Sequence, residues 1–287
     1  MRYAKPTSAA EAAGLLAAET GVTRVLAGGT DVMVQLKAGM IEPALVVDIK
    51  AIPGVRSITA EAGGFRIGAA VSGAELGEHK ALCAAWPGVT EGAQLIGSKQ
   101  VQGRCSMVGN LCNASPAGDA VPGLVAAGAT VRIEGPNGTR DAAVETIPTG
   151  PGKTSLAKGE IITSVFLPVR APRSSDAYLR FIPRTEMDIA VASAAVNLTL
   201  DASGTVTAAR VALGAVAATV LLVEAAAKAI IGTKLDDAAL AALEKAASAA
   251  AKPISDKRGT VEFRTKVVGV LARRAAVIAY ERAGGAK

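Results

Sequence analysis

The chain has 287 residues, of which 50% are hydrophobic, and its formal net charge is +6. A chain of this length and composition can bury a substantial core, which excludes a disordered segment and leaves room for two or three subdomains. With only 1 Trp, 3 Tyr and 4 Phe, it lacks the aromatic platforms on which single-stranded nucleic-acid binders stack bases.

The positive charge is concentrated at one end of the sequence. Residues 252–287 contain nine Lys or Arg and three Asp or Glu, while the residues before them carry 22 of each sign. A solvated helix face is the commonest cause of such a run. A docking face for another subunit and a nucleic-acid contact are the alternatives, in that order.

The sequence argues against a metal-binding site and against a membrane-spanning segment. The chain has one histidine and three cysteines, Cys83, Cys105 and Cys112, too few for an iron–sulfur cluster or a structural zinc. Reduced thiols and an N-terminus without an apolar leader predict a cytoplasmic protein. The apolar stretch 211–231 contains Glu224 and Lys228, which indicates a strand followed by a buried helix and not a membrane span.

The N-terminal residues predict a βαβ unit. Ser8–Glu11 has the pattern of a capping box and begins a helix. Arg24–Ala27 is expected to be a buried strand, and Gly28–Asp31 a tight turn into a second helix. Leu45–Ile49 is the next strand, so the glycine turn lies at the carboxyl end of the first strand of the unit.

From about Ile52 the pattern changes to a longer α/β region. Strands are predicted at 65–67, 130–134 and 161–167, and helices at 74–86, 90–97 and 120–127. Ser98–Asp119 is expected to be a long loop rich in glycine and polar residues. A cluster of Pro, Arg and Ser at 171–175 predicts a boundary.

The last third predicts an antiparallel sheet followed by helices. Strands are expected at 177–182, 190–200 and 206–216, with a turn at Asp201–Gly204. Helices are expected from Leu235 and at Thr260–Tyr280. The second helix is expected to bury one face, composed of Phe263, Val267, Val270, Leu271 and Ile278. The predicted domains are residues 1–55, 56–172 and 173–287.

The first candidate site is the segment Val25–Val32, which contains Gly28 and Gly29. Glycines let backbone amides approach a phosphate closely, and the following helix start adds unpaired N–H groups. The sequence contains no GxGxxG fingerprint of a standard dinucleotide fold. A simple Gly-Gly turn is the alternative interpretation of this segment.

The second candidate site is Ser106–Asp119, within the long loop. A loop of this length and polarity is more often functional than a mere connection. Its hydroxyl, amide and backbone donors could surround a polar ligand. Asp119 is either a contact to a ribityl or ribose hydroxyl or the N-cap of the next helix.

Other motifs do not form a catalytic site. Gly150–Thr154 ends like a P-loop, but Ile147 stands where the first glycine is required. His79 is expected on an exposed helix face, no serine lies in a GxSxG elbow, and no pair of carboxylates stands out for acid–base work. We therefore predict no catalytic side chain.

The two loops occur in this order, about 80 residues apart, with Phe181–Ala190 after them. The ordered set resembles the FAD-binding medium subunit of the molybdenum hydroxylases, which include xanthine, carbon monoxide and nicotinate dehydrogenases. The resemblance covers nearly the whole chain. It implies an α+β, PCMH-type (vanillyl-alcohol-oxidase-like) FAD-binding fold, with two α/β subdomains and a small C-terminal antiparallel sheet with helices.

The resemblance also implies which residues hold FAD. The first pyrophosphate loop corresponds to Val25, Leu26, Ala27, Gly28, Gly29, Thr30, Asp31 and Val32. The second corresponds to Ser106, Met107, Val108, Gly109 and Asn110. Single contacts correspond to Ile96, Asp119, Ile162, Arg180 and Ile189. In one departure from the family, Val108 stands where the first of two glycines is usual, so its Cβ is expected to displace the loop or constrain its backbone.

The function that the resemblance implies is electron transfer. A large subunit with a molybdenum–pterin site would hydroxylate the substrate, and a small subunit with two [2Fe–2S] clusters would pass electrons to this FAD and on to an external acceptor. A dimer of heterotrimers is expected. The alternatives are a self-contained FAD oxidoreductase of the same fold, an interaction subunit that has lost FAD, and a DNA-binding protein that uses the basic C-terminal helix.

Overall fold

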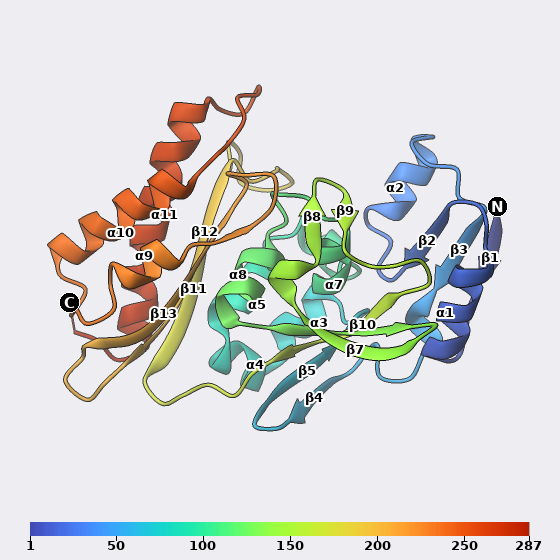
Figure 1. Ribbon diagram of the computed structural model, residues 1–287, viewed down its shortest axis with the longest axis horizontal. Coiled ribbons are helices and arrows are strands. Elements are labelled where there is room, and N and C mark those ends of the chain that lie inside the picture. Colours follow the sequence, from blue (N-terminus) through green and yellow to red (C-terminus); the bar gives the residue numbers. More distant parts are fainter. Residues whose placement is uncertain (287) are drawn as a thin grey trace.

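The computed structural model describes residues 1–286. Its three parts follow one another along the long axis of the molecule, from the N-terminal elements through the central ones to the C-terminal ones (Figure 1). Helices and strands are mixed, and the chain ends in an antiparallel sheet with helices. This confirms the predicted fold class.

The N-terminal part is a small parallel sheet with one covering helix. Its elements are β1 (Arg2–Ala4), α1 (Ala9–Ala18), β2 (Thr23–Leu26), α2 (Val32–Lys37), β3 (Leu45–Asp48) and η1 (Ile49–Ala51). The strand order is β1-β3-β2, so the apolar β3 is central and wholly buried. The expectation that 24–27 is buried is wrong: β2 is an edge strand, and Val25 is 36% exposed.

Side-chain caps explain where two helices begin. Ser8 Oγ accepts from the amide of Glu11 at 3.1 Å as predicted, but the Glu11 carboxylate turns to the amide of Thr7. The complete capping box lies elsewhere, between Ser72 and Glu75, and it opens α3. Each cap satisfies amides that have no partner within the helix.

The central part is an antiparallel sheet with helices packed on it. Its elements are β4 (Ile58–Glu61), β5 (Gly64–Gly68), α3 (Gly73–Glu78), α4 (Lys80–Ala85), α5 (Pro87–Gln94), α6 (Lys99–Gln102), α7 (Met107–Cys112), α8 (Ala120–Ala127), β6 (Thr130–Gly135), β7 (Gly138–Ala143), η2 (Val144–Thr146), β8 (Pro148–Gly150), β9 (Lys153–Thr154) and β10 (Ile161–Leu167). The sheet order is β4-β5-β10-β6-β7, and β8 and β9 form a separate hairpin. Every residue of α8 is buried, so this helix is at the centre of the core.

Two expectations for the central part need correction. The helix expected at 74–86 is broken at His79, whose Nδ1 accepts from the Leu82 amide at 3.1 Å and starts α4. The His79 ring also packs edge-on against Phe65, so it does not lie on an exposed helix face. The loop expected at 98–119 contains the short helices α6 and α7.

The C-terminal part is a four-stranded antiparallel sheet with helices on one face (Figure 1). Its elements are β11 (Ser174–Phe181), β12 (Ala192–Leu200), β13 (Val206–Gly214), β14 (Leu221–Leu222), α9 (Glu224–Lys228), α10 (Asp237–Ala250) and α11 (Val261–Arg282). The strands follow one another in sequence order, and each pair of neighbours is antiparallel. The other face of the sheet packs against α5 and α8.

The buried face of α11 differs from the expected one. Of the five apolar residues expected on that face, Leu271 is buried, Val267 and Ile278 are partly buried and pack against the C-terminal core, and Phe263 is 41% exposed. The sheet instead contacts a row of small residues that includes Ala272, Ala275 and Ala279. Small side chains let the helix axis approach the sheet closely. Side-chain volume, and not hydrophobicity alone, therefore determines which face of α11 packs on the sheet. Within residues 1–286 no helix is both long and apolar enough to cross a membrane.

Candidate functional site: a glycine-lined pocket

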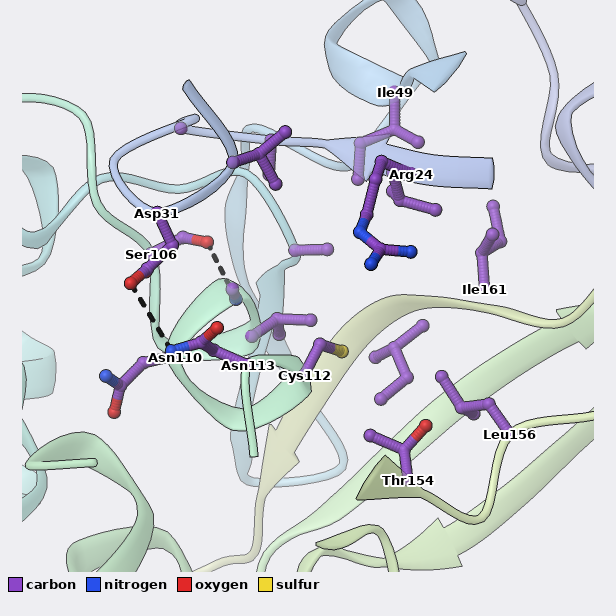
Figure 2. Close-up of a pocket in the computed structure, with 18 of the residues that line it drawn as sticks. Arg24, Asp31, Ile49, Ser106, Asn110, Cys112, Asn113, Thr154, Leu156 and Ile161 are labelled. Carbon is purple, nitrogen blue, oxygen red and sulfur yellow. Dashed lines mark hydrogen bonds between the residues drawn. The ribbon is translucent and has the colours of Figure 1, made fainter. Parts of the chain in front are cut away.

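A pocket of about 630 Å³ lies between the N-terminal sheet and the central part. Three segments line it: the loop after β2, the residues around α7, and the segment from Gly152 to Ile162 (Figure 2). Among residues 1–286, those that line the pocket include no aromatic side chain. Its volume is that of a pocket for a small molecule or cofactor.

The first wall of the pocket is the loop after β2, from Ala27 to Val32, and it needs glycine for two different reasons. A Cβ built on Gly28 would lie 1.7 Å from the carbonyl oxygen of Arg104, so Gly28 permits contact between two backbones. Gly29 has φ +81°, a left-handed conformation that side chains disfavour. Lys50 fixes the strand that precedes them: Nζ donates to the Ala27 carbonyl at 2.9 Å and pairs with Asp48 at 2.7 Å.

The second wall begins at Ser106, the N-cap of α7. Ser106 Oγ accepts from the amide of Gly109 at 3.0 Å. The amides of Met107 and Val108 precede it in the first turn and have no acceptor within the helix. Asn110 Oδ1 accepts from the amide of Ala120 at 3.1 Å, which ties this wall to α8. A Cβ on Gly109 would meet only Ser106 Oγ, at 3.0 Å, so the pocket side of this residue is open.

Of the two effects expected of the Val108 Cβ, the structure shows the second, a backbone in the ordinary helical region. Its side chain is only 5% exposed and belongs to the main hydrophobic core. Its backbone is helical, with no positive φ. The loop therefore accommodates this Cβ without the backbone strain that a left-handed position would impose.

One hydrogen bond joins the two walls. Asn113 Nδ2 donates to Asp31 Oδ1 at 3.3 Å, and the bond is drawn beside that of Ser106 in Figure 2. Asp31 follows the first glycine turn, and Asn113 ends α7. Two segments about 80 residues apart in the sequence thus form one surface.

The structure separates the expected FAD contacts into two groups. Those that line the pocket are Val25, Ala27, Gly28, Gly29, Thr30, Asp31, Val32, Ile96, Ser106, Val108, Gly109, Asn110 and Ile162. Those that lie outside its lining are Leu26, Met107, Asp119, Arg180 and Ile189. Ile189 is 50% exposed on the loop between β11 and β12.

Asp119 lies in a buried polar cluster at the junction with the C-terminal sheet. The Tyr178 hydroxyl donates to Asp119 Oδ1 at 2.7 Å, and Arg180 Nη1 lies 2.5 Å from Oδ2. Both carboxylate oxygens are therefore occupied by residues of β11. Asp119 occupies the N-cap position of α8, as one of the two interpretations expected, but its side chain makes no hydrogen bond to the first turn of that helix.

We expect Asp119 to make stability depend on pH. Burial raises the pKa of Asp119 to about 6, although the charge of Arg180 and the bond from Tyr178 act against this shift. The pKa of Asp119 in the folded state lies above its ordinary value, so the protonated carboxyl stabilises the fold. This contribution to the free energy of unfolding is full below about pH 4 and is lost as pH rises through about 6.

Asp119→Asn keeps the shape of the side chain and removes its titration. The free energy of unfolding of the wild type minus that of the variant should fall by about 2–3 kcal/mol between pH 4 and 7. Urea unfolding of both proteins across this range measures the difference. A difference that stays constant with pH would show that Asp119 does not titrate there.

Sequence reasoning missed the third wall of the pocket almost entirely. Gly152, Thr154, Leu156 and Lys158 line it, and Ile162 was the only residue of this wall expected to do so. The Gly150–Thr154 motif, which belongs to this wall, does not match a P-loop. A weaker signal was available in its two glycines, which are typical of a tight hairpin.

Arg24 was missed as well. It precedes the first candidate loop on β2 and lines the pocket, with its side chain pointing into it (Figure 2). A strand expected to be buried gives no reason to place a charged side chain in a binding site. On an edge strand beside a pocket, a charged side chain can stay partly exposed.

Family models match both parts of the sequence. Residues 1–170 match the FAD binding domain in molybdopterin dehydrogenase, and residues 177–278 match the CO dehydrogenase flavoprotein C-terminal domain. The first match alone covers more than half of the chain.

Whole-chain comparisons agree with the family models. The carbon monoxide dehydrogenase medium chain of Afipia carboxidovorans is 34% identical, over 98% of this chain and 97% of that one. A putative xanthine dehydrogenase FAD-binding subunit of Escherichia coli is 29% identical, over 99% and 97%. A solved CO dehydrogenase structure from Oligotropha carboxidovorans contains a chain that superposes with a TM-score of 0.93 at 34% identity, with 98% of each chain covered. The chain therefore belongs to the family of FAD-binding medium subunits of the molybdenum hydroxylases.

Proposed function

We propose that this chain holds one noncovalent FAD and relays electrons within a molybdenum hydroxylase complex. The observation that carries the proposal is the meeting of the two glycine segments in one pocket. At Gly28 an added Cβ would collide with backbone, while at Gly109 bare backbone faces the pocket. Backbone without Cβ is what close approach to a pyrophosphate requires.

In this proposal the cofactor lies between the first two predicted domains, 1–55 and 56–172. The segments Val25–Val32 and Ser106–Asn110 hold its pyrophosphate, and Ile96 and Ile162 supply apolar contacts. The assignments of Asp119 to a ribityl or ribose hydroxyl, of Arg180 to a cofactor contact and of Ile189 to the flavin ring stay predictions, because these residues lie outside the pocket lining.

The chemistry of the pocket supports noncovalent attachment. Cys105 and Cys112 line it. Burial raises the pKa of the Cys105 thiol, and burial raises the pKa of Cys112 to about 12. Both thiols therefore stay protonated and weakly nucleophilic. The imidazole of His79 does not line the pocket and caps α4 instead. Neither kind of side chain is thus prepared to form a bond to a flavin.

The residues of the pocket bind and orient; they do not catalyse proton transfer. Of its two carboxylates, Asp31 is bonded to Asn113 and Glu160 is paired with Arg140. When bound, FAD supplies the one- and two-electron chemistry that an electron relay needs. The protein's part is to hold the cofactor at a fixed position and to exclude solvent from it.

The relatives are named as medium chains or FAD-binding subunits, which supports a role inside a larger assembly. We propose a large molybdopterin subunit and a small [2Fe–2S] subunit as partners, assembled as a cytoplasmic dimer of heterotrimers. The large subunit would choose the substrate, whether a heterocycle, an aldehyde or carbon monoxide.

Purification of the tagged chain from its own cells tests this role. We expect it to carry along two further polypeptides, with molybdenum, iron and FAD in constant ratios. A chain that is isolated alone and oxidises a substrate by itself would support the self-contained oxidoreductase instead. Flavin-free protein in an intact complex would indicate an interaction subunit that has lost its cofactor.

A further inference from the structure

The end of the pocket away from the glycine walls has a distinct composition. Arg24 lies there near Ile49 and Ile161, and Leu156 lies farther across the pocket, near Thr154 (Figure 2). Ile49 and Ile161 are each 2% exposed, so the base of this end is apolar. The pocket thus combines a polar, glycine-lined region with an apolar region that carries one guanidinium group.

Within the described residues 1–286, the guanidinium of Arg24 is not part of an ion pair and makes only one local hydrogen bond. Its one side-chain hydrogen bond goes from Nη1 to the carbonyl oxygen of its neighbour Thr23, at 2.9 Å. No carboxylate of that part of the chain lies within ion-pair distance of it. Most arginines that touch the interior do have such partners, as Arg170 has Asp176 and Arg264 has Asp256.

The position of Arg24 along β2 separates it from the glycine turn. It precedes Ala27 by three residues, which is about 10 Å along an extended strand. A ligand whose phosphates lie at Gly28, Gly29 and Gly109 would therefore place a different group at Arg24. The proposed flavin contact, Ile189, belongs to the C-terminal part, whereas Arg24 belongs to the N-terminal part (Figure 1), so the group of an extended dinucleotide that reaches Arg24 is the adenine beyond the ribose.

The pocket offers a base few stacking surfaces. Bases are usually held by aromatic rings or by a planar guanidinium, and the lining contains no aromatic residue. Among the lining residues that the structure describes, Arg24 supplies the one guanidinium, and the same lining contains the aliphatic side chains of Ile49, Leu156 and Ile161.

We propose that Arg24 recognises the adenine of the cofactor by stacking its guanidinium on the ring. The site is thereby selective for flavin adenine dinucleotide over flavin mononucleotide. This inference rests on the proposed FAD site and assigns the specificity of its adenine end to one residue.

The test compares three ligands on the full chain after removal of its flavin. ADP carries the adenine without the flavin, FMN carries the flavin without the adenine, and FAD carries both. Arg24→Ala should raise the dissociation constants for ADP and FAD about tenfold, which is about 1.4 kcal/mol. The dissociation constant for FMN should change less than twofold. Titration calorimetry for ADP and flavin fluorescence for FAD and FMN supply the values.

Two further variants separate stacking from charge and from folding. Arg24→Lys keeps the charge but loses the plane, and we expect its ADP affinity to stay within twofold of that of Arg24→Ala. Arg56→Ala removes an arginine that lies outside the pocket and pairs with Glu75 on the surface. It should bind all three ligands as the wild type does.

Several results would overturn the inference. They are an unchanged ADP affinity in Arg24→Ala, full rescue by lysine, or an equal loss of FAD and FMN affinity. If the wild type takes up neither flavin, the proposed function fails, and the ADP titration still decides the role of Arg24. In that case ADP binding that depends on Arg24 upholds the base site, and the absence of ADP binding rejects it.

Discussion

Gly109→Val is expected to weaken FAD binding about 10- to 100-fold while leaving the chain folded. The Cβ of the new side chain would meet only Ser106 Oγ, so its methyl groups project into the pocket where we place the pyrophosphate. Crowding a well-packed site in this way costs about 1–3 kcal/mol. The ratio of flavin to protein after purification, followed by titration with FAD, measures the loss.

A second glycine provides the control. Gly14 lies on the exposed side of α1, with no atom within 4 Å of an added Cβ, and it does not line the pocket. Gly14→Val should retain flavin as the wild type does. Equal flavin content in the Gly109 variant and the wild type would show that the second glycine wall does not contact the cofactor.

Asp176→Ala is expected to destabilise the fold by about 3–5 kcal/mol. Asp176 is 3% exposed, and it pairs with Arg170 at 2.8 Å and accepts from the Val89 amide at 3.0 Å. Removing the carboxylate leaves the charge of Arg170 buried against the Trp86 ring, 3.8 Å away. It also leaves a buried amide of α5 without its partner, and this loosens the junction between the central part and β11.

An exposed ion pair gives the comparison for Asp176. Asp141 and Arg132 are joined at 3.1 Å, but their side chains are 48% and 36% exposed. Asp141→Ala should cost less than about 1 kcal/mol, since solvent screens such pairs. Urea unfolding measures the free energy of unfolding of the two variants, and the loss should be several times larger for Asp176→Ala than for Asp141→Ala. Similar losses in both would mean that the Asp176 pair does not stabilise the junction.

The sequence predicted much of the fold because most strands are apolar runs bounded by turn residues. The runs at 161–167, 190–200 and 206–216 became β10, β12 and β13 with shifts of two residues or fewer at either end. Helix α8 and the turn before β13 followed from the same kind of signal. The local sequence pattern was enough to predict these elements because the burial of their residues agrees with their intrinsic helix or strand preference.

The pattern failed where a single side chain or a distant contact decides the structure. His79 breaks a helix by capping the next one, and the polar stretch before α8 hides two short helices held by tertiary packing. The sheet selected the alanine face of α11 because that face packs closely, which a hydrophobic periodicity cannot reveal.

The candidate site divides in the same way. Gly28 and Gly29 could be found because a glycine turn after a strand is a local feature, and Ser106 and Gly109 because the order of the two loops resembles that of the family. Arg24 and the wall from Gly152 to Ile162 could not, because only the folded chain brings them opposite those turns. The bonds of Asp119 to Tyr178 and Arg180 depend on how the C-terminal sheet packs against α8, which lies beyond local sequence.

The central claim is that the glycine-lined pocket holds one noncovalent FAD. An absorption spectrum of the chain purified alone, before and after acid precipitation, tests it most directly. We predict the two flavin absorption bands in the intact protein and release of all the colour as FAD into the supernatant, one per chain. Colourless protein that takes up no added FAD, or flavin that stays with the precipitate, would contradict the claim.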